Sequence, residues 1–254
     1  MKPKSSSSHR FLTACGCVSC EKDQGNTAKG TDVSRRGFLC SAIGGTAAML
    51  AGAAVSTTRP ALAQSSLTPE AALQELMDGN KRYLSGQLKS LNEDLAILKA
   101  KTAEKQEPFA ALLSCADSRV PVEFVFDQSI GELFVVRVAG NIATPEIIAS
   151  IEYGVAVLGT KVLMVLGHGS CGAVKAAIEG KAVPGQISAL YAPIRPAVDV
   201  GGANLDAAID ANAKIQAALL SRASPLIAEA IKEGKLKAVA ARYDIVTGAV
   251  SLLI

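Results

Sequence analysis

Two cysteines and one histidine have the side chains and the spacing of metal ligands. Cys115 stands alone, and His168 and Cys171 follow about fifty residues later, three positions apart. Thiolate sulfur and imidazole nitrogen are preferred ligands of Zn²⁺, and two thiolates balance the charge of that ion. Three protein ligands leave the fourth tetrahedral position for water or substrate, as in catalytic sites. We therefore predict that these residues hold one catalytic Zn²⁺ per subunit.

A disulfide between the same two cysteines is the alternative, since we also expect the protein to be exported, and exported proteins often contain disulfides. Of six Cys and two His in the chain, only Cys115, His168 and Cys171 lie beyond residue 63. A structural zinc site would normally need a fourth Cys or His, which this segment does not offer. The composition therefore favours a catalytic metal site over a structural one.

Each candidate ligand follows a short apolar run that is typical of a buried strand. Residues 109–114 (FAALLS) precede Cys115, and residues 162–166 (VLMVL) precede His168. Ligand sites in α/β sheets lie at the carboxyl ends of the strands. If the two strands are neighbours, all three side chains will meet at this edge of the sheet.

Strand-like and helix-like segments alternate along the rest of the chain. We expect strands at 109–115, 133–138, 162–167 and 236–243, with an antiparallel return at 248–253. Helices are expected at 69–83, 91–105, 145–158, 171–180, 204–220 and 224–233. This order predicts an α/β fold with a mostly parallel central sheet flanked by helices and an antiparallel C-terminal edge strand. Pro193 and Pro196, before Gly201, predict a loop.

The N-terminal segment has the features of an export signal. Arg35 and Arg36 form a twin-arginine pattern, residues 38–55 are apolar, and 61–63 (ALA) fit a signal-peptidase site. We predict that residues 1–63 are a removed twin-arginine-type signal peptide. The mature protein would then be periplasmic, without a stable membrane anchor. An uncleaved anchor or an apolar helix of the domain is the alternative.

The charged and thiol residues of this leader differ from those of the domain. It carries eight Lys/Arg and three Asp/Glu, whereas the rest carries 18 basic and 20 acidic residues. A domain without basic excess argues against nucleic-acid binding. Cys15, Cys17 and Cys20 have the residue type for a metal or redox site, but a Ser- and Gly-rich segment without a packed shell favours unpaired thiols.

The two motifs around the candidate ligands resemble those of β-class carbonic anhydrases. Residues 115–119 (CADSR) and 168–171 (HGSC) match the paired family motifs, and 131–141, 150–155 and 243–248 are also similar. The resemblance covers most of residues 68–254. It implies that residues 64–254 form a zinc domain which catalyses reversible hydration of CO2 to bicarbonate and a proton, by attack of zinc-bound hydroxide.

The resemblance also implies roles for individual side chains. Asp117 and Arg119 match a catalytic dyad in which Asp117 orients the hydroxide and Arg119 keeps Asp117 ionised. In a closed state Asp117 would become the fourth zinc ligand. An ordinary ion pair at a turn is the alternative for this dyad. The resemblance places five further residues in the substrate pocket: Gln106, Phe134, Ala139, Tyr153 and Gly172.

Subunit contacts and other activities follow from the same resemblance. N-terminal helices of the family pack on a partner subunit, which implies a homodimer or a dimer of dimers; packing on the helices' own domain is the alternative. The fold alone does not fix the substrate. Hydrolysis of CS2 or COS, a non-catalytic zinc- or bicarbonate-binding module, and a metal-free domain with a disulfide therefore remain as alternatives.

Overall fold

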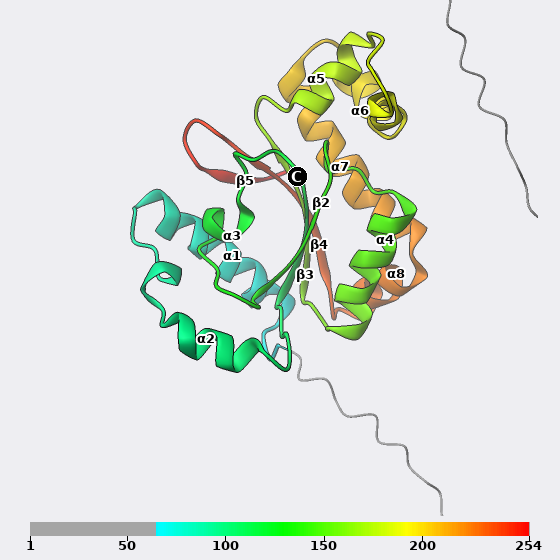
Figure 1. Ribbon diagram of the computed structural model, residues 1–254. Coiled ribbons are helices and arrows are strands. Elements are labelled where there is room, and N and C mark those ends of the chain that lie inside the picture. The colour runs from blue at the N-terminus through cyan, green and yellow to red at the C-terminus, as the bar shows by residue number, and fades with distance from the viewer. Residues whose placement is uncertain (1–64, 254) are drawn as a thin grey trace, which may run out of the picture. The chain divides into compact units, whose positions relative to one another are not determined.

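A five-stranded sheet forms the centre of the protein in a computed structural model that describes residues 65–253 (Figure 1). The strands are β1 (Ala110–Ser114), β2 (Leu133–Arg137), β3 (Val162–His168), β4 (Lys237–Tyr243) and β5 (Val250–Leu253). Their order is β2-β1-β3-β4-β5, and only β5 runs antiparallel to its neighbour. This topology confirms the predicted fold class. The expected signal peptide, residues 1–63, lies outside the described residues.

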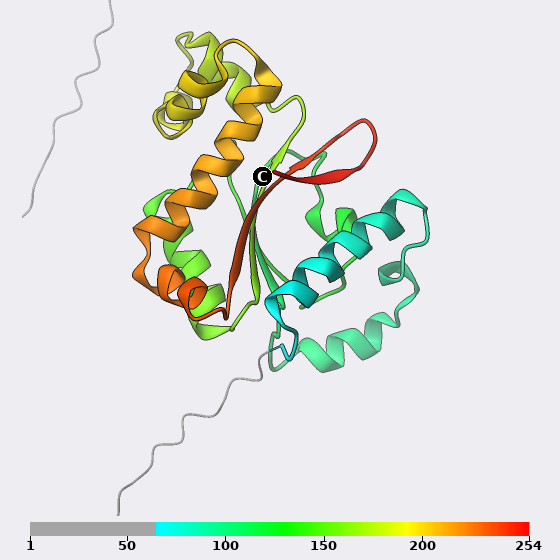
Figure 2. The same ribbon diagram turned by 180° about the vertical axis from the view of Figure 1, so that it is seen from behind.

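Helices lie around this sheet. They are α1 (Pro69–Leu84), α2 (Leu95–Thr102), α3 (Val122–Val125), α4 (Pro145–Glu152), α5 (Gly172–Glu179), α6 (Tyr191–Gly201), α7 (Leu205–Ala223) and α8 (Pro225–Lys232). Figures 1 and 2 show α1 and α3 on one face and α4, α7 and α8 on the other. Among residues 65–253, none of the helices combines the length and the apolar character needed to span a membrane.

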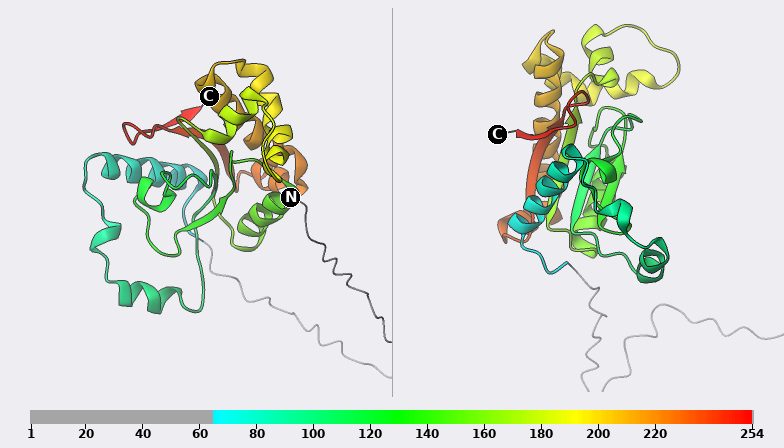
Figure 3. Two further views of the ribbon diagram at one scale, coloured as in Figure 1. Left: turned by 45° about the horizontal axis from the view of Figure 1, so that its top comes forward. Right: turned by 90° about the vertical axis from the view of Figure 1, so that its left-hand side faces the viewer.

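The two central strands are buried on both faces, as their continuous apolar sequences predict. Leu112 of β1 packs with Met164 of β3 under α1, and Leu113 packs with Val165 under α7. The strands pair in parallel from Ala110 beside Val162 to Ser114 beside Leu166. Their carboxyl ends therefore lie next to each other. The α5 and α6 segments, yellow-green to yellow in Figure 3, lie beyond this edge.

The first helix begins where its sequence predicts. Thr68 is the N-cap, and its hydroxyl accepts a hydrogen bond from the Ala71 amide at 3.2 Å. Pro69 follows at the first helical position, where its missing N–H costs nothing. The buried face of α1, with Ala72 and Leu76, packs on its own sheet. No residue of α2 is buried, so packing on a partner subunit remains a prediction for α2.

Two predictions of local structure need correction. The helix expected at 91–105 is present as α2, but it is shorter than predicted and follows a separate 3₁₀ helix, Ser90–Asn92. Asp94 separates them because its carboxylate caps α2 by accepting a hydrogen bond from the Ala96 amide at 2.8 Å.

The predicted loop around Pro193 and Pro196 is the helix α6. Pro193 lies in the first turn, where backbone N–H groups have no helical partner, and Pro196 gives up one helical hydrogen bond. Ile194 and Ala197 on the same helix are fully buried. Their burial against α5 and α7 offsets the missing bond.

Candidate metal centre

Three candidate ligand side chains meet at the carboxyl edge of the sheet. Cys115 directly follows β1, His168 ends β3, and Cys171 is the N-cap of α5. The two sulfurs and an imidazole nitrogen all lie within 4.8 Å of one another. Both cysteines are free thiols, so they do not form the alternative disulfide here. The structure thus confirms that the two strand ends bring Cys115, His168 and Cys171 together.

The imidazole of His168 is arranged to bind a metal ion. Its Nδ1 lies 2.9 Å from the carbonyl oxygen of Gly169, which can only accept, so Nδ1 carries the proton. The other nitrogen, Nε2, is fully buried and has no hydrogen-bond partner among the described residues. Buried polar atoms without partners are rare. A lone pair of this kind beside two thiols fits a soft divalent cation such as Zn²⁺.

The two sulfurs differ in their affinity for protons. A hydrogen bond between them lowers the pKa of Cys115, helped by His168 and the Gly140 amide against the effect of burial. The same contact and burial raise the pKa of Cys171. Binding of a divalent cation requires both sulfurs as thiolates and therefore displaces any proton that they carry, as is usual for thiolate sites.

A carboxylate and a guanidinium stand beside this centre. Arg119 donates from Nε to Oδ1 of Asp117 at 2.9 Å and from Nη2 to Oδ2 at 2.7 Å. The Arg119 amide also donates to Oδ1, at 2.9 Å. These hydrogen bonds hold the pKa of Asp117 well below its usual range. Asp117 is therefore ionised, and its Oδ2 lies 4.0 Å from Nε2 of His168.

Comparison with known proteins identifies the family. Residues 110–250, more than half of the chain, match the family model described as carbonic anhydrase. The chain belongs to the carbonic anhydrase family. It is 35% identical over 188 residues to carbonic anhydrase 2 of Mycobacterium tuberculosis, covering 71% of this chain and 90% of that protein. It is 34% identical over 192 residues to the carbonic anhydrase of Mycolicibacterium smegmatis, covering 72% and 93%.

Solved structures show the same fold for this carbonic anhydrase. A β-carbonic anhydrase of Coccomyxa, in complex with acetazolamide, superimposes with a TM-score of 0.55 at 27% identity over 72% of this chain and 86% of that one. Tetrameric β-carbonic anhydrases of Sordaria macrospora give a TM-score of 0.57 at 24% identity over 71% and 96%. The predicted enzyme class, carbonic anhydrase, is confirmed by the family model and the curated relatives.

Two residues beside the centre of this carbonic anhydrase were missed in the sequence. Arg137, the last residue of β2, donates to the carbonyl oxygens of Cys115 at 2.9 Å and Asp117 at 2.6 Å. Gly140 donates its amide to Sγ of Cys115 at 3.3 Å. Arg137 thereby fixes the loop that carries a ligand and the carboxylate. The signal available in the sequence was an arginine at the end of an apolar strand. Its hydrogen-bond partners could not be predicted, because they depend on which strand lies beside β2.

The pocket residues implied by the resemblance fall into two groups. Gly172 begins α5 directly after Cys171, and Ala139 precedes Gly140, so both lie beside the centre. Phe134 pairs with Ala111, near the opposite end of β1 from Cys115. Four residues separate Ala111 from Cys115, which is about 13 Å along the strand at ~3.3 Å per residue. Its ring lies 6.1 Å from that of Tyr153, centroid to centroid.

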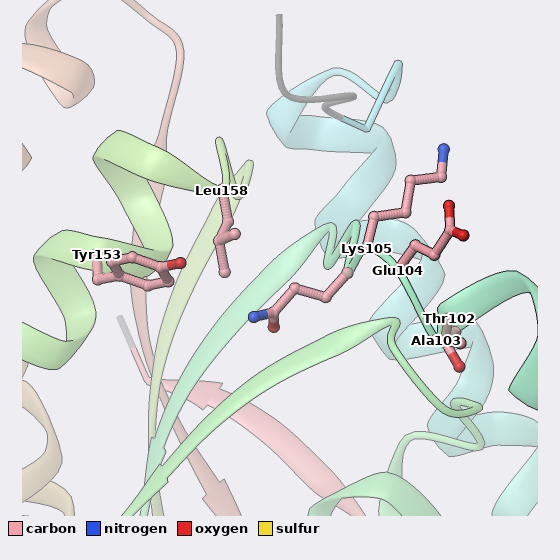
Figure 4. A pocket seen from close by; sticks show the side chains of 7 residues that line it. Thr102, Ala103, Glu104, Lys105, Tyr153 and Leu158 are labelled. Atoms are coloured by element: carbon pink, nitrogen blue, oxygen red, sulfur yellow. The ribbon is translucent and has the colours of Figure 1, made fainter. Parts of the chain in front are cut away.

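Gln106 precedes β1 and is likewise at the far end of the strand from Cys115. It lines a surface hollow of about 490 Å³ together with Tyr153. Figure 4 shows Tyr153 and Leu158 on one side of this hollow and residues 102–105 on the other. Within one subunit, therefore, Gln106, Phe134 and Tyr153 do not reach the metal centre.

Proposed function

We propose that this carbonic anhydrase binds one Zn²⁺ through Cys115, His168 and Cys171 and catalyses the reversible hydration of CO2 to bicarbonate and a proton. The observation that carries the proposal is the cluster of three ligand atoms within 4.8 Å, in which the buried Nε2 of His168 has no hydrogen-bond partner in the described part of the chain. Three protein ligands leave one coordination position open for the reaction.

The reaction needs a nucleophile near neutral pH. Cys115, His168 and Cys171 would hold the zinc ion, which would supply hydroxide by acidifying water, as is known for carbonic anhydrases with three histidine ligands. The ionised Asp117 can accept a hydrogen bond from the nucleophile and orient its lone pair toward the carbon of CO2. Arg119 keeps Asp117 charged and in place through two side-chain hydrogen bonds. Arg137 holds the backbone on which Asp117 is carried.

Asp117 is also the residue that would close the site. Arg119 engages both of its carboxylate oxygens, so Asp117 would become a fourth ligand only after Arg119 releases it. We propose that these are two states of one centre. In the arrangement described, Arg119 holds the carboxylate, which keeps it available for the nucleophile.

A second copy of the chain would complete the substrate pocket. The resemblance assigns Gln106, Phe134 and Tyr153 to the pocket, but they lie at the far end of β1 and β2 from their own centre. Tyr153 is nevertheless 47% exposed, which leaves its ring free for contact with another subunit. In a two-fold symmetric dimer, each copy would supply these residues to the other.

Stopped-flow measurement of CO2 hydration tests the proposed activity. Zinc-loaded full-length protein should be active, and Cys171→Ser should lose both bound zinc and activity. Cys40→Ser, which changes a cysteine of the predicted leader, is the matched control and should leave both unchanged. Activity in Cys171→Ser equal to that of the wild type would refute the metal assignment.

We also propose that residues 1–63 direct export of the enzyme to the periplasm and are removed on export. Support comes from the Arg35-Arg36 pair, the apolar segment 38–55 and the small residues at 61–63. Expression in a bacterium with a twin-arginine pathway should give periplasmic protein that begins near Gln64. Cytoplasmic protein that still begins at Met1 would contradict export.

A further inference from the structure

Two buried amide side chains on α7 lie one helical turn apart. Asn212 and Gln216 are each 1% exposed, and Nε2 of Gln216 donates to Oδ1 of Asn212 at 3.3 Å. Burying amides costs free energy unless they are hydrogen-bonded. Their partners therefore show what the pair holds in place.

Both amides bind the loop that follows β2. Nδ2 of Asn212 donates to the carbonyl oxygen of Gly140 at 2.8 Å. Oε1 of Gln216 accepts from the amide of Ala143 at 2.9 Å, and its Nε2 also donates to the carbonyl oxygen of Pro193 at 3.0 Å. The loop from Gly140 to Ala143 is thus tied to α7 at both ends.

This loop has a backbone conformation that needs support. Gly140 has φ of +78° and Asn141 has φ of +44°, so two consecutive residues lie in the left-handed region. Such a conformation is uncommon for a residue with a side chain and persists where the surroundings enforce it. Packing is also tight, since a Cβ at Gly140 would lie 2.8 Å from Cδ1 of Ile194.

The conformation has one chemical result at the metal centre. It aims the amide of Gly140 at Sγ of Cys115, at 3.3 Å. A hydrogen bond to a ligand sulfur reduces the charge that the sulfur donates to a metal ion, and such outer contacts tune metal sites. Because α7 holds the carbonyl side of Gly140, it also restricts where the neighbouring amide points.

We propose that Asn212 and Gln216 are positioning residues which, through Gly140, keep an N–H group on the Cys115 sulfur and so set its donor strength toward the metal. The inference rests on the proposed metal binding at Cys115, His168 and Cys171. It assigns to α7 a role in the centre, although neither amide is a ligand.

Cobalt substitution gives a direct readout of the sulfur. Thiolate-to-Co²⁺ charge-transfer absorption moves to longer wavelength when the sulfur donates more charge. In Asn212→Leu we expect this shift. We also expect Co²⁺ affinity about 10- to 100-fold lower, because the loop against the Cys115 ligand is no longer held in place, and this loss outweighs the stronger donation by the sulfur. Gln216→Met, which keeps the side-chain length, should change both quantities in the same direction and serves if Asn212→Leu does not fold.

The test uses the full-length chain. Other cysteines must not contribute to the absorption. In every variant, including the reference protein, the four N-terminal cysteines are replaced by Ser: Cys15, Cys17, Cys20 and Cys40.

Asn80 provides a matched control for a merely structural role. It is also a buried amide, at 3% exposed, and bonds the backbone of Val125, Gly248 and Val250 in the α1 region. Asn80→Leu should destabilise the protein but leave the cobalt band in place. Folded Asn212→Leu and Gln216→Met with the reference band and affinity would overturn the inference, as would an equal shift in Asn80→Leu. No charge-transfer band in the reference protein would overturn the metal site as well.

Discussion

Oδ2 of Asp117 lies 4.0 Å from Nε2 of His168, the buried nitrogen that we propose as a metal ligand, while Arg119 holds both oxygens of the same carboxylate. The carboxylate thus lies next to the candidate metal centre, but its hydrogen bonds are made with Arg119. This arrangement suits a group that accepts a hydrogen bond from the nucleophile while the three ligands hold the metal. It separates the catalytic role that we propose for Asp117 from metal retention.

Asp117→Asn should therefore lower CO2 hydration without releasing zinc. The amide keeps the shape of the carboxylate but loses its charge and can present an N–H to the nucleophile. We expect kcat/KM to fall about 10²- to 10⁴-fold, the usual range for a lost proton-transfer or orienting group. Zinc content, measured on the same samples, should stay at the wild-type level. An Asp117→Asn enzyme of full activity would contradict the orienting role.

Mixed oligomers test whether the pocket is shared between subunits. Cys171→Ser and the double variant Gln106→Ala/Tyr153→Ala should each be weakly active or inactive alone. If each subunit completes its partner's pocket, co-refolded mixtures should regain roughly one quarter of wild-type activity, because half of the dimers are hybrid and each has one intact site. Mixtures that form hybrids but remain as inactive as their parents would place the pocket within one subunit.

The Arg82–Asp127 pair should make stability depend on pH in the acid range. Burial opposes the charge of Asp127, but hydrogen bonds from Arg82 and from the Ser90 and Lys89 amides outweigh it and lower its pKa to about 2. A carboxyl group with a lowered pKa stabilises the folded state at pH values above its ordinary pKa, near 3.8. This stabilisation is lost as the pH falls toward 2. The free energy of unfolding of the wild-type protein should fall by about 2 kcal/mol through this residue as the pH is lowered.

Urea unfolding at pH 6 and pH 2.5 measures this loss. Asp127→Asn should be less stable at pH 6, and the difference from wild type should shrink at pH 2.5. Asp78→Asn, at an exposed carboxylate that pairs with Lys81, should show little effect at either pH. A difference between Asp127→Asn and wild type that does not change with pH would argue against the ionised pair.

Replacing Gly79, inside α1, by alanine should not stabilise the protein. Alanine is a better helix former than glycine by up to ~1 kcal/mol. At Gly79, however, a Cβ would lie 1.8 Å from the carbonyl oxygen of Phe126, so backbone would have to move. Gly79→Ala should therefore destabilise the protein by about 1–3 kcal/mol, the range for overpacking.

Gly172→Ala is the matched change for this measurement, since no atom lies within 4 Å of the added Cβ at the start of α5. Its free energy of unfolding should equal or exceed that of the wild type. Thermal or urea denaturation of the two variants side by side decides the point. If the Gly79→Ala variant is as stable as the Gly172→Ala variant, the backbone after α3 can move away from α1 at little cost in free energy.

Local sequence was sufficient for the strands and for the meeting of the three candidate ligands. The apolar runs before Cys115 and His168 predict two buried strands, and parallel pairing of their carboxyl ends then brings the ligands together. The N-cap at Thr68 was equally predictable, because its partners are neighbours in sequence. In each case the deciding interactions are local or follow from a general property of parallel sheets.

Features that depend on distant contacts could not be predicted in this way. The helix α6 forms despite Pro196 because Ile194 and Ala197 are buried by α5 and α7. Arg137 bonds the loop after β1 only because β1 and β2 are neighbours. The sequence shows that Asn212 and Gln216 are four residues apart. It does not show that they are buried or that they bind the loop at 140–143.

X-ray absorption at the zinc edge of the zinc-loaded enzyme tests the central assignment most directly. The reference protein should have its four N-terminal cysteines replaced by Ser, so that only Cys115 and Cys171 can provide sulfur. We predict one zinc per subunit with two sulfur neighbours at about 2.3 Å and one imidazole nitrogen at about 2.0–2.1 Å. A zinc ion without sulfur neighbours, or purified protein without metal in which the two cysteines form a disulfide, would contradict it.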